Sequence, residues 1–254
     1  MPSRRQETNP RMLLAQPNVA SAQRRESVRD DILQVRAPAL CFYVLRDSNG
    51  LYLIDGGFIG GRYLLASALR RRGWNQEPIR GIIVTHGHLD HILNVASIAK
   101  DSGAWIAAPR LDAAHYEGRF PYRGAARVCG LLEAIGRRLF SYSPFKTDRW
   151  LDDYSEIPVW HGLTAIHLPG HTNGHTGLYC HDLKLLFCAD LFASYGTISH
   201  PPPAIFNSRP ELIRSSIARA LTLDLEGVIP NHCDAAPSSE HLKRLRLLKE
   251  RLGR

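Results

Sequence analysis

The sequence contains no long hydrophobic run. A transmembrane helix needs about 18 or more consecutive apolar residues, and no such stretch occurs in the 254 residues, so we expect no membrane span. The N-terminal stretch MPSRRQETNPRMLLAQPNVASAQRRES is basic and has no apolar core of the kind that a secretory signal needs. We expect residues 1–30 to be a flexible basic segment and the protein to be cytoplasmic, and we leave open whether this segment is a targeting sequence.

Paired cysteines are also missing. The cysteines are odd in number, scattered and without a CxxC motif: Cys41, Cys129, Cys180, Cys188 and Cys233. A chain of this length buries enough apolar surface to fold without disulfides. Scattered, unpaired cysteines are typical of a reducing compartment, so we expect free thiols. The sequence also has no Ser-His-Asp signature, which makes a serine hydrolase an unfavourable interpretation.

The charge is unbalanced, with a formal net charge of +8 at pH 7. Arginines cluster at positions 70–72 and 137–138 and in the final stretch HLKRLRLLKERLGR. Basic clusters can bind nucleic acid. Here, however, each cluster lies beside leucines at helical spacing, which is typical of a solvated helix face. Nucleic acid is therefore kept only as the alternative partner.

Strand and helix patterns alternate in the first half of the sequence. The stretch 33–57 predicts two strands joined by a turn at DSNG. The predicted elements that follow are a helix at 61–73 ending at Gly73, a strand at 79–85, a helix at 91–103 and a strand at 104–109. This alternation indicates an α/β fold.

The second half begins with a break in this rhythm at about 110–150, where aromatic loops surround a predicted helix at 125–140. Three closely spaced strands then suggest an antiparallel meander. The predicted elements are strands at 163–170, 176–182 and 184–190, a helix at 209–223, a strand at 226–230 and a C-terminal helix from Ser238.

Histidines and carboxylates cluster in the stretch THGHLDH. His86, His88, Asp90 and His91 fall within six positions. His86 and His88 are two residues apart at the end of a predicted strand, where both side chains point the same way, and Asp90 and His91 follow as the chain enters a helix. Imidazole and carboxylate groups suit zinc and other first-row ions. Two ions would need further ligands from elsewhere.

Further ligand candidates follow other predicted strands. His171 lies in a glycine-rich loop, Asp190 ends the stretch LLFCAD, and His232 comes just after the last strand. Loops at strand ends are where a rigid scaffold carries its functional groups. We therefore expect all three side chains near the THGHLDH stretch.

Five stretches in order, LYLIDGG, THGHLDH, LPGHTNG, LLFCAD and IPNHC, resemble the five motifs of the metallo-β-lactamase superfamily over roughly residues 35–235. The resemblance implies a four-layer αββα sandwich of two mixed β-sheets with outer helices. It also implies one domain at 31–254, interrupted by the insertion at about 110–150.

The resemblance implies seven metal ligands: His86, His88 and His171 for one ion, Asp90, His91 and His232 for the second, and Asp190 bridging both. Asp55 matches a carboxylate that supports the ligand loop without binding metal. Two residues depart from the family pattern. Ala189 stands where glycine is usual, and Cys233 follows His232, where we interpret it as an inert thiol.

The implied cofactors are two divalent metal ions, zinc first, with manganese or iron as alternatives. The implied enzyme is a dinuclear hydrolase in which a metal-bridging hydroxide cleaves a small ester, thioester or lactone, with Asp90 and Asp190 as catalytic carboxylates. A redox di-iron member would carry Glu in place of His88, and true β-lactamases usually lack the bridging aspartate. The spacing from His171 to Asp190 resembles that of the glyoxalase-II-like and lactonase-like branch. The alternative is a nucleic-acid phosphodiester hydrolase or nucleic-acid-binding protein.

Aromatic residues of the insertion are candidates for substrate contacts. We predict Tyr116, Phe120 and Tyr122 on a pocket wall, together with Phe140, Tyr142 and Phe145, and Tyr195 as an oxyanion donor. The alternative is that the insertion's aromatics pack it onto the sandwich or form a homodimer contact. His167 and His175 are interpreted as structural.

Overall fold

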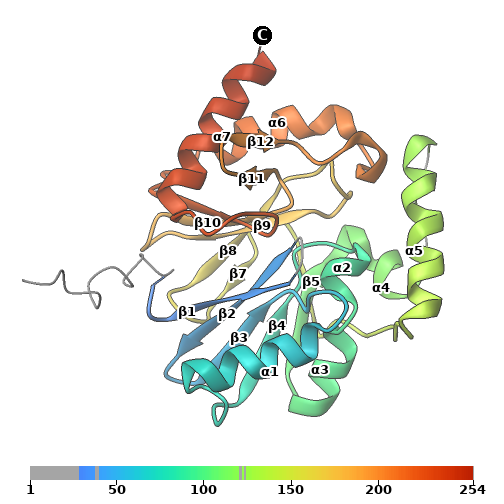
Figure 1. Cartoon of the computed structure of the whole chain (residues 1–254), viewed down its shortest axis with the longest axis vertical. Coiled ribbons are helices and arrows are strands. Elements are labelled where there is room, and N and C mark those ends of the chain that lie inside the picture. Colours follow the sequence, from blue (N-terminus) through green and yellow to red (C-terminus); the bar gives the residue numbers. More distant parts are fainter. Residues whose placement is uncertain (1–28, 38–39, 120–121, 123, 254) are drawn as a thin grey trace, which may run out of the picture.

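The computed structural model describes residues 29–37, 40–119, 122 and 124–253. Two β-sheets face each other in the middle of the molecule, and helices cover their outer faces (Figure 1). This arrangement confirms the predicted α/β sandwich of mixed sheets. The predicted N-terminal segment, 1–30, lies almost entirely outside the described residues.

The first sheet has six strands in chain order: β1 Ile32–Arg36, β2 Cys41–Asp47, β3 Gly50–Ile54, β4 Ile79–Ile83, β5 Trp105–Pro109 and β6 Arg149–Leu151. The pairs β1–β2 and β2–β3 are antiparallel, and β3 to β6 run parallel. The predicted hairpin turn at DSNG joins β2 to β3. The stretch before this turn forms two strands rather than the predicted one, because the chain reverses where the Ala37 amide donates to the Leu40 carbonyl.

The second sheet has five strands in the order β13-β10-β9-β8-β7. Their bounds are β7 Glu156–Ile157, β8 Leu163–His167, β9 Thr176–Cys180, β10 Leu185–Ala189 and β13 Gly227–Pro230. Strands β8, β9 and β10 form the predicted antiparallel meander, and β13 pairs parallel with β10. A separate two-stranded ribbon consists of β11 Ala193–Tyr195 and β12 Ile198–His200.

Three apolar layers hold the four structural layers together. Between the sheets, side chains such as Tyr43, Ile83 and Phe187 are fully buried. Helices α1 Gly61–Arg72 and α3 Val95–Ser102 pack on the outer face of the first sheet. Helices α6 Ile213–Ala220 and α7 Ser238–Gly253 pack on the outer face of the second. Each sheet is therefore buried on both faces, which explains why its strands are apolar without strict alternation.

Local capping explains where two helices end and begin. Helix α1 ends before Gly73, which has φ 78° and donates its amide to the Arg70 carbonyl, the usual left-handed helix end. The helix predicted at 91–103 is divided into α2 Leu89–Ile92 and α3. At this break the Asn94 side chain donates to the carbonyls of Gly56, Gly57 and Phe58, so it ties the end of β3 to the break.

The insertion connects β5 to β6 and contains α4 Ala113–Tyr116 and α5 Arg127–Leu139. Helix α5 matches the helix predicted at 125–140 and stands beside the two sheets, at the right of Figure 1. Within the described residues, no helix combines the length and apolar character needed to cross a bilayer.

Candidate metal centre

The first half of the molecule contributes four polar side chains from the segment after β4. His86 and His88 lie in the loop from β4 to α2, and Asp90 and His91 lie in α2 itself. The three histidines are almost completely buried, and Asp90 is partly exposed. Gly87 lets the loop pass close to the insertion, because a Cβ on it would lie 2.5 Å from the His115 Cβ.

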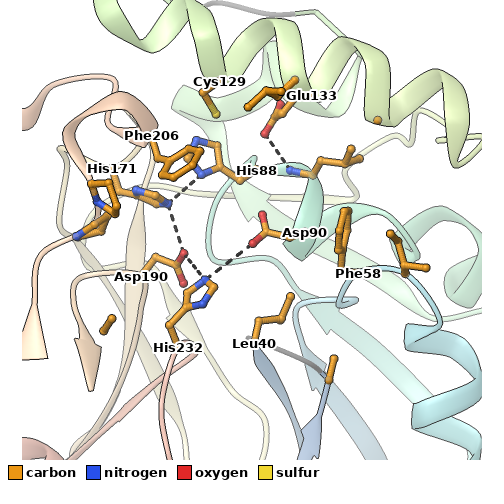
Figure 2. A pocket seen from close by; sticks show the side chains of 18 of the residues that line it. Leu40, Phe58, His88, Asp90, Cys129, Glu133, His171, Asp190, Phe206 and His232 are labelled. Atoms are coloured by element: carbon orange, nitrogen blue, oxygen red, sulfur yellow. Dashed lines mark hydrogen bonds and ion pairs between the residues drawn. The ribbon is translucent and has the colours of Figure 1, made fainter. Parts of the chain in front are cut away.

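The second half contributes three more side chains, each just after a strand. His171 follows β8, Asp190 follows β10 directly, and His232 follows β13. In Figure 2 these three approach from one side, while His88 and Asp90 approach from the other. The site therefore forms where the two halves of the sandwich meet.

The seven side chains fall into two groups whose potential ligand atoms lie within 4.8 Å of one another: His86, His88 and His171 in one, and Asp90, His91, Asp190 and His232 in the other. The Asp190 carboxylate contacts both. Its Oδ2 lies 3.3 Å from the His171 Nε2 and 3.0 Å from the His232 Nε2, and its Oδ1 lies 3.3 Å from the His91 Nε2. The structure thus brings together all seven residues predicted as ligands.

Several buried atoms of these groups have no hydrogen-bond partner, among them the Nε2 atoms of His86 and His88. Buried polar atoms without partners cost free energy, and a cation would satisfy them. Burial holds the pKa of both His86 and His88 well below its usual value, so both imidazoles are neutral, as metal ligation requires. Nitrogen and carboxylate donors of this kind suit zinc and other first-row ions. The residues present therefore fit divalent metal ions.

Opposite charges surround Asp190. Burial alone would raise its pKa, but the charges of His232 and His91 outweigh burial and hold the pKa of this carboxyl well below its usual value. Asp190 in turn raises the pKa of His232 to about 9. Without metal, a carboxylate and protonated imidazoles balance each other here. Bound cations would take the place of these protons.

Asp55 holds the first ligand segment from behind. It lies at the end of β3, fully buried, and accepts hydrogen bonds from the Thr85 amide (2.8 Å) and the Thr85 hydroxyl. Its Oδ2 also lies 2.8 Å from the His91 Nδ1 and 2.8 Å from the Asn231 Nδ2. Asp55 therefore sets the orientation of His91 and links it to the strand end that carries His232.

Asp112 is a buried carboxylate that sequence reasoning did not identify. It accepts from the Gly87 amide (2.8 Å) in the first half, and from the Thr172 hydroxyl (2.6 Å) and the Gly174 amide (2.7 Å) in the second. It thus joins the two ligand loops. Nothing in the sequence around Asp112 marks it among the other carboxylates.

Glu133 and Arg137 of α5 form a buried ion pair, with 3.2 Å between the Glu133 Oε2 and the Arg137 guanidinium. The Glu133 Oε1 accepts from the Leu89 amide, and Arg137 donates to the carbonyls of Gly87 and His115. Through these hydrogen bonds the pair fixes the backbone on either side of His88. The expectation that positions 137–138 form a solvated face is therefore wrong for Arg137, because its guanidinium is buried against the Glu133 carboxylate and backbone carbonyls.

His171 and Asp190 have their own supports in the second half. The Asn207 Oδ1 lies 2.9 Å from the His171 Nδ1. The His175 Nε2 accepts from the Asp190 amide, and its Nδ1 donates to the Leu168 carbonyl at 2.9 Å. Burial lowers the pKa of His175 to about 3, so this imidazole stays neutral. These contacts agree with its interpretation as a structural residue, and His167 likewise contacts the Asn173 carbonyl.

All five cysteines are free and buried, which confirms the expectation of unpaired thiols. The Cys233 Sγ lies 3.2 Å from the Pro230 carbonyl and 3.8 Å from the Tyr43 hydroxyl. It therefore points into the packing between the sheets.

A pocket of about 900 Å³ opens above the candidate ligands. Tyr195 and Phe140 line it. Tyr116 does not line it. This residue is fully buried, stacks on Phe145 and donates its hydroxyl to the Pro109 carbonyl, so it packs the insertion onto the first sheet.

Tyr122 lies beside His88, with 5.9 Å between the ring centroids, and also outside the lining of the pocket. Phe120 lies outside the described residues. Burial raises the pKa of Tyr195 to about 12, so its phenol remains protonated and able to donate.

The chain matches the model of the metallo-beta-lactamase superfamily over residues 39–232. The match contains all seven candidate ligands and Asp55.

Curated relatives include the hydroxyacylglutathione hydrolase of Aeromonas hydrophila, 31% identical over 71% of this chain and 56% of that protein. A probable metallo-hydrolase of Bacillus subtilis is 23% identical over 73% of this chain and 76% of its own length. The chain spans only a little over half the length of the Aeromonas relatives.

Solved structures agree on the fold. A subclass B3 metallo-beta-lactamase of Bradyrhizobium japonicum has a TM-score of 0.62 and 22% identity, and the match covers 88% of this chain and 90% of that one. A metallo-beta-lactamase family protein of Thermus thermophilus has a TM-score of 0.65 and 19% identity, covering 87% and 78%.

Proposed function

The chain belongs to the metallo-beta-lactamase superfamily, and on that premise we propose that it is a dinuclear metal-dependent hydrolase of a small ester, thioester or lactone. The observation that carries this proposal is the convergence of seven ligand-type side chains from both halves of the molecule, with the Asp190 carboxylate in contact with both groups. We take zinc as the first candidate metal and manganese or iron as alternatives.

The proposed role of each ligand-type residue follows from the group to which it belongs in the site. His86, His88 and His171 would hold one ion, and Asp90, His91 and His232 the second, with Asp190 between them. When bound, such a pair of ions supplies an activated water and a Lewis acid.

In the proposed reaction, water adds to the carbonyl carbon and the bond from this carbon to sulfur or oxygen breaks. The products are an acid and a thiol or alcohol, or, from a lactone, a single hydroxy acid. Asp90 is the partly exposed carboxylate of the site, with its Oδ2 3.8 Å from the His232 Nε2, and it lines the pocket. It would accept the proton of the water and return it to the leaving group. Tyr195, protonated and on the pocket wall, would donate to the substrate oxygen.

The bond type is inferred from the relatives. Those described above as hydroxyacylglutathione hydrolases act, by name, on an acyl group joined to glutathione, and that bond is a thioester. A nucleic-acid phosphodiester hydrolase is not favoured, because no comparison above points to a nucleic acid. We also propose that residues 31–254 work as one domain in the cytoplasm, where its free thiols stay reduced.

The test is metal content combined with proton release by the metal-loaded protein. The substrates are a thioester, a lactone, a β-lactam and a phosphodiester. An Asp190→Asn variant, expected to lose bound metal and activity together, provides the blank. Turnover of a thioester or lactone above this blank supports the proposal. Turnover of the phosphodiester alone, or activity that survives in the variant, contradicts it.

A further inference from the structure

The pocket above the candidate ligands has an apolar wall. Helix α5, which carries Cys129 and Glu133, lies on one side, and the loop after β3, which carries Phe58, lies on another (Figure 2). Residues in and near β11 and β12 contribute further lining. The apolar side chains that form this wall include Phe58, Ile59, Leu132, Phe140, Phe192 and Phe206. Its volume of about 900 Å³ lies near the upper end for small-molecule pockets. A substrate larger than a short acyl group therefore fits.

Among the described residues, none of those that line the pocket is lysine or arginine. Away from the candidate ligands, the polar donors of the lining are Tyr195 and His200. Apart from the candidate ligands, the only carboxylate on the wall is Glu133, and it is already paired with Arg137 and the Leu89 amide.

This wall does not suit glutathione. A glutathione group carries two carboxylates, and burying a carboxylate without a cation or donor costs several kcal/mol. Among the described residues, the wall offers the two carboxylates of an acyl–glutathione no lysine or arginine, whereas a neutral apolar chain needs no such partner.

The mouth of the pocket is also apolar. Leu132 and Ile59 line the pocket, yet each is about half exposed, at 55% and 51%. Phe140 is partly exposed at the same opening. Exposed apolar side chains that continue into a cavity mark a ligand-binding groove. An apolar chain would cover these side chains on binding.

We propose that the substrate is a neutral ester, thioester or lactone whose acyl part is an apolar chain of several carbons. The chain lies along α5 against Leu132 and Phe140, and the carbonyl faces the site at Asp190 and His232. This inference rests on the proposed hydrolase function and narrows its substrate class.

The first experiment compares acetyl, butyryl, hexanoyl, octanoyl and decanoyl thioesters of two thiols, neutral N-acetylcysteamine and glutathione. For the neutral series, kcat/KM should rise about fourfold per added methylene until the wall is covered, corresponding to about 0.8 kcal/mol each. At equal acyl length, the glutathione thioester should be no better than the neutral one. A flat chain-length profile, or a glutathione thioester favoured by tenfold or more, would overturn the inference.

A matched pair of variants tests the role of α5. Leu132→Asn replaces a pocket residue, while Leu131→Asn replaces its exposed neighbour, which lies outside the pocket lining. Leu132→Asn should lower kcat/KM for the decanoyl thioester by about tenfold, and the loss should be much smaller for the acetyl thioester, whose acyl group is short. Leu131→Asn should match the wild type on both. Equal effects of the two variants would count against the assigned wall.

A binding experiment separates this inference from the hydrolase proposal. Nile red, a neutral fluorophore, should bind the Asp190→Asn protein and be displaced by methyl decanoate but not by glutathione. If no ester, thioester or lactone is hydrolysed but displacement occurs, the hydrolase proposal fails and the apolar pocket stands. If thioesters are hydrolysed and methyl decanoate displaces nothing, the pocket inference fails alone.

Discussion

At the scale of single residues, Asp55 shows how a buried carboxylate prepares a neighbouring imidazole. Its Oδ2 contacts the His91 Nδ1, which leaves the His91 Nε2 facing Asp190. We predict that Asp55→Asn weakens metal binding about 10–100-fold, the usual effect of removing such a partner. Competition with a chromophoric chelator measures this. Asp182→Asn changes an exposed aspartate and should leave the affinity as it is, and an unchanged affinity in Asp55→Asn would refute the role.

His232 makes the stability of the metal-free protein depend on pH. Its pKa is raised by Asp190 from 6.5 to about 9 in the folded state, so protonated His232 stabilises the fold. This contribution is complete below pH 6.5 and is lost as the pH rises through about 9. The excess stability of the chelator-treated wild type over His232→Gln, from urea unfolding, should therefore shrink between these values. An excess that grows with pH would contradict the assignment.

At the scale of elements, side chains of α5 hold the ligand segment, residues 86–91, through hydrogen bonds to the backbone of that segment. Glu133 and Arg137 bind the amide of Leu89 and the carbonyl of Gly87, on either side of His88. Arg137→Met leaves the Glu133 carboxylate buried without its partner. Breaking a buried pair in this way costs about 3–5 kcal/mol.

We therefore predict a large loss in the free energy of unfolding for Arg137→Met, measured in urea, and faster amide exchange at residues 86–91. Arg138→Met on the exposed side of α5 is the matched control and should change the free energy by less than about 0.5 kcal/mol. Adding Glu133→Gln to Arg137→Met should recover part of the loss, because it removes the unpaired charge. Equal losses in the free energy of unfolding for Arg137→Met and Arg138→Met would rule out this role of the Glu133–Arg137 pair.

The separate elements were largely predictable. Helix α1, the meander β8–β10, helix α5 and helix α7 appear where periodicity and turn residues indicate, because these signals are local. The reversal between β1 and β2 and the break between α2 and α3 were not predicted. Both depend on contacts with distant segments: the Asn94 side chain, for example, binds carbonyls of the loop after β3.

At the scale of the whole molecule, the proposed metals would join the two halves. His86, His88, Asp90 and His91 come from the half built on the first sheet, and His171, Asp190 and His232 from the other. A ligand that binds only the folded state, at a free concentration of 100 times its Kd, stabilises it by about 2.7 kcal/mol.

For a chain of this size, this stabilisation corresponds to a change in Tm of about 5–10 °C. We predict that a chelator lowers Tm by this amount in calorimetry and that zinc restores it. Asp190→Asn should respond less, since it removes the carboxylate shared by both groups. If the chelator leaves the Tm of the wild type unchanged, the proposal that metal ions bound between the two halves stabilise the fold is contradicted.

The sequence by itself determined the kind of fold and the chemistry of the site. The strands, the helices and the ligand-type residues at strand ends are encoded in short stretches such as THGHLDH and LLFCAD, so they can be read without knowing what lies opposite. This local character explains why the seven residues could be listed as candidates from the sequence, while the resemblance to the superfamily assigned them to two metal ions.

Only the tertiary structure decided what surrounds these residues. Asp112 and Glu133 hold the ligand loops through backbone amides, and Leu132 faces a cavity while Tyr116 fills the core. Such roles depend on which segments, far apart in the sequence, are packed together. A buried carboxylate and a solvated one, or an aromatic in a core and one on a pocket wall, have the same local pattern, and only their environment in the folded chain distinguishes them.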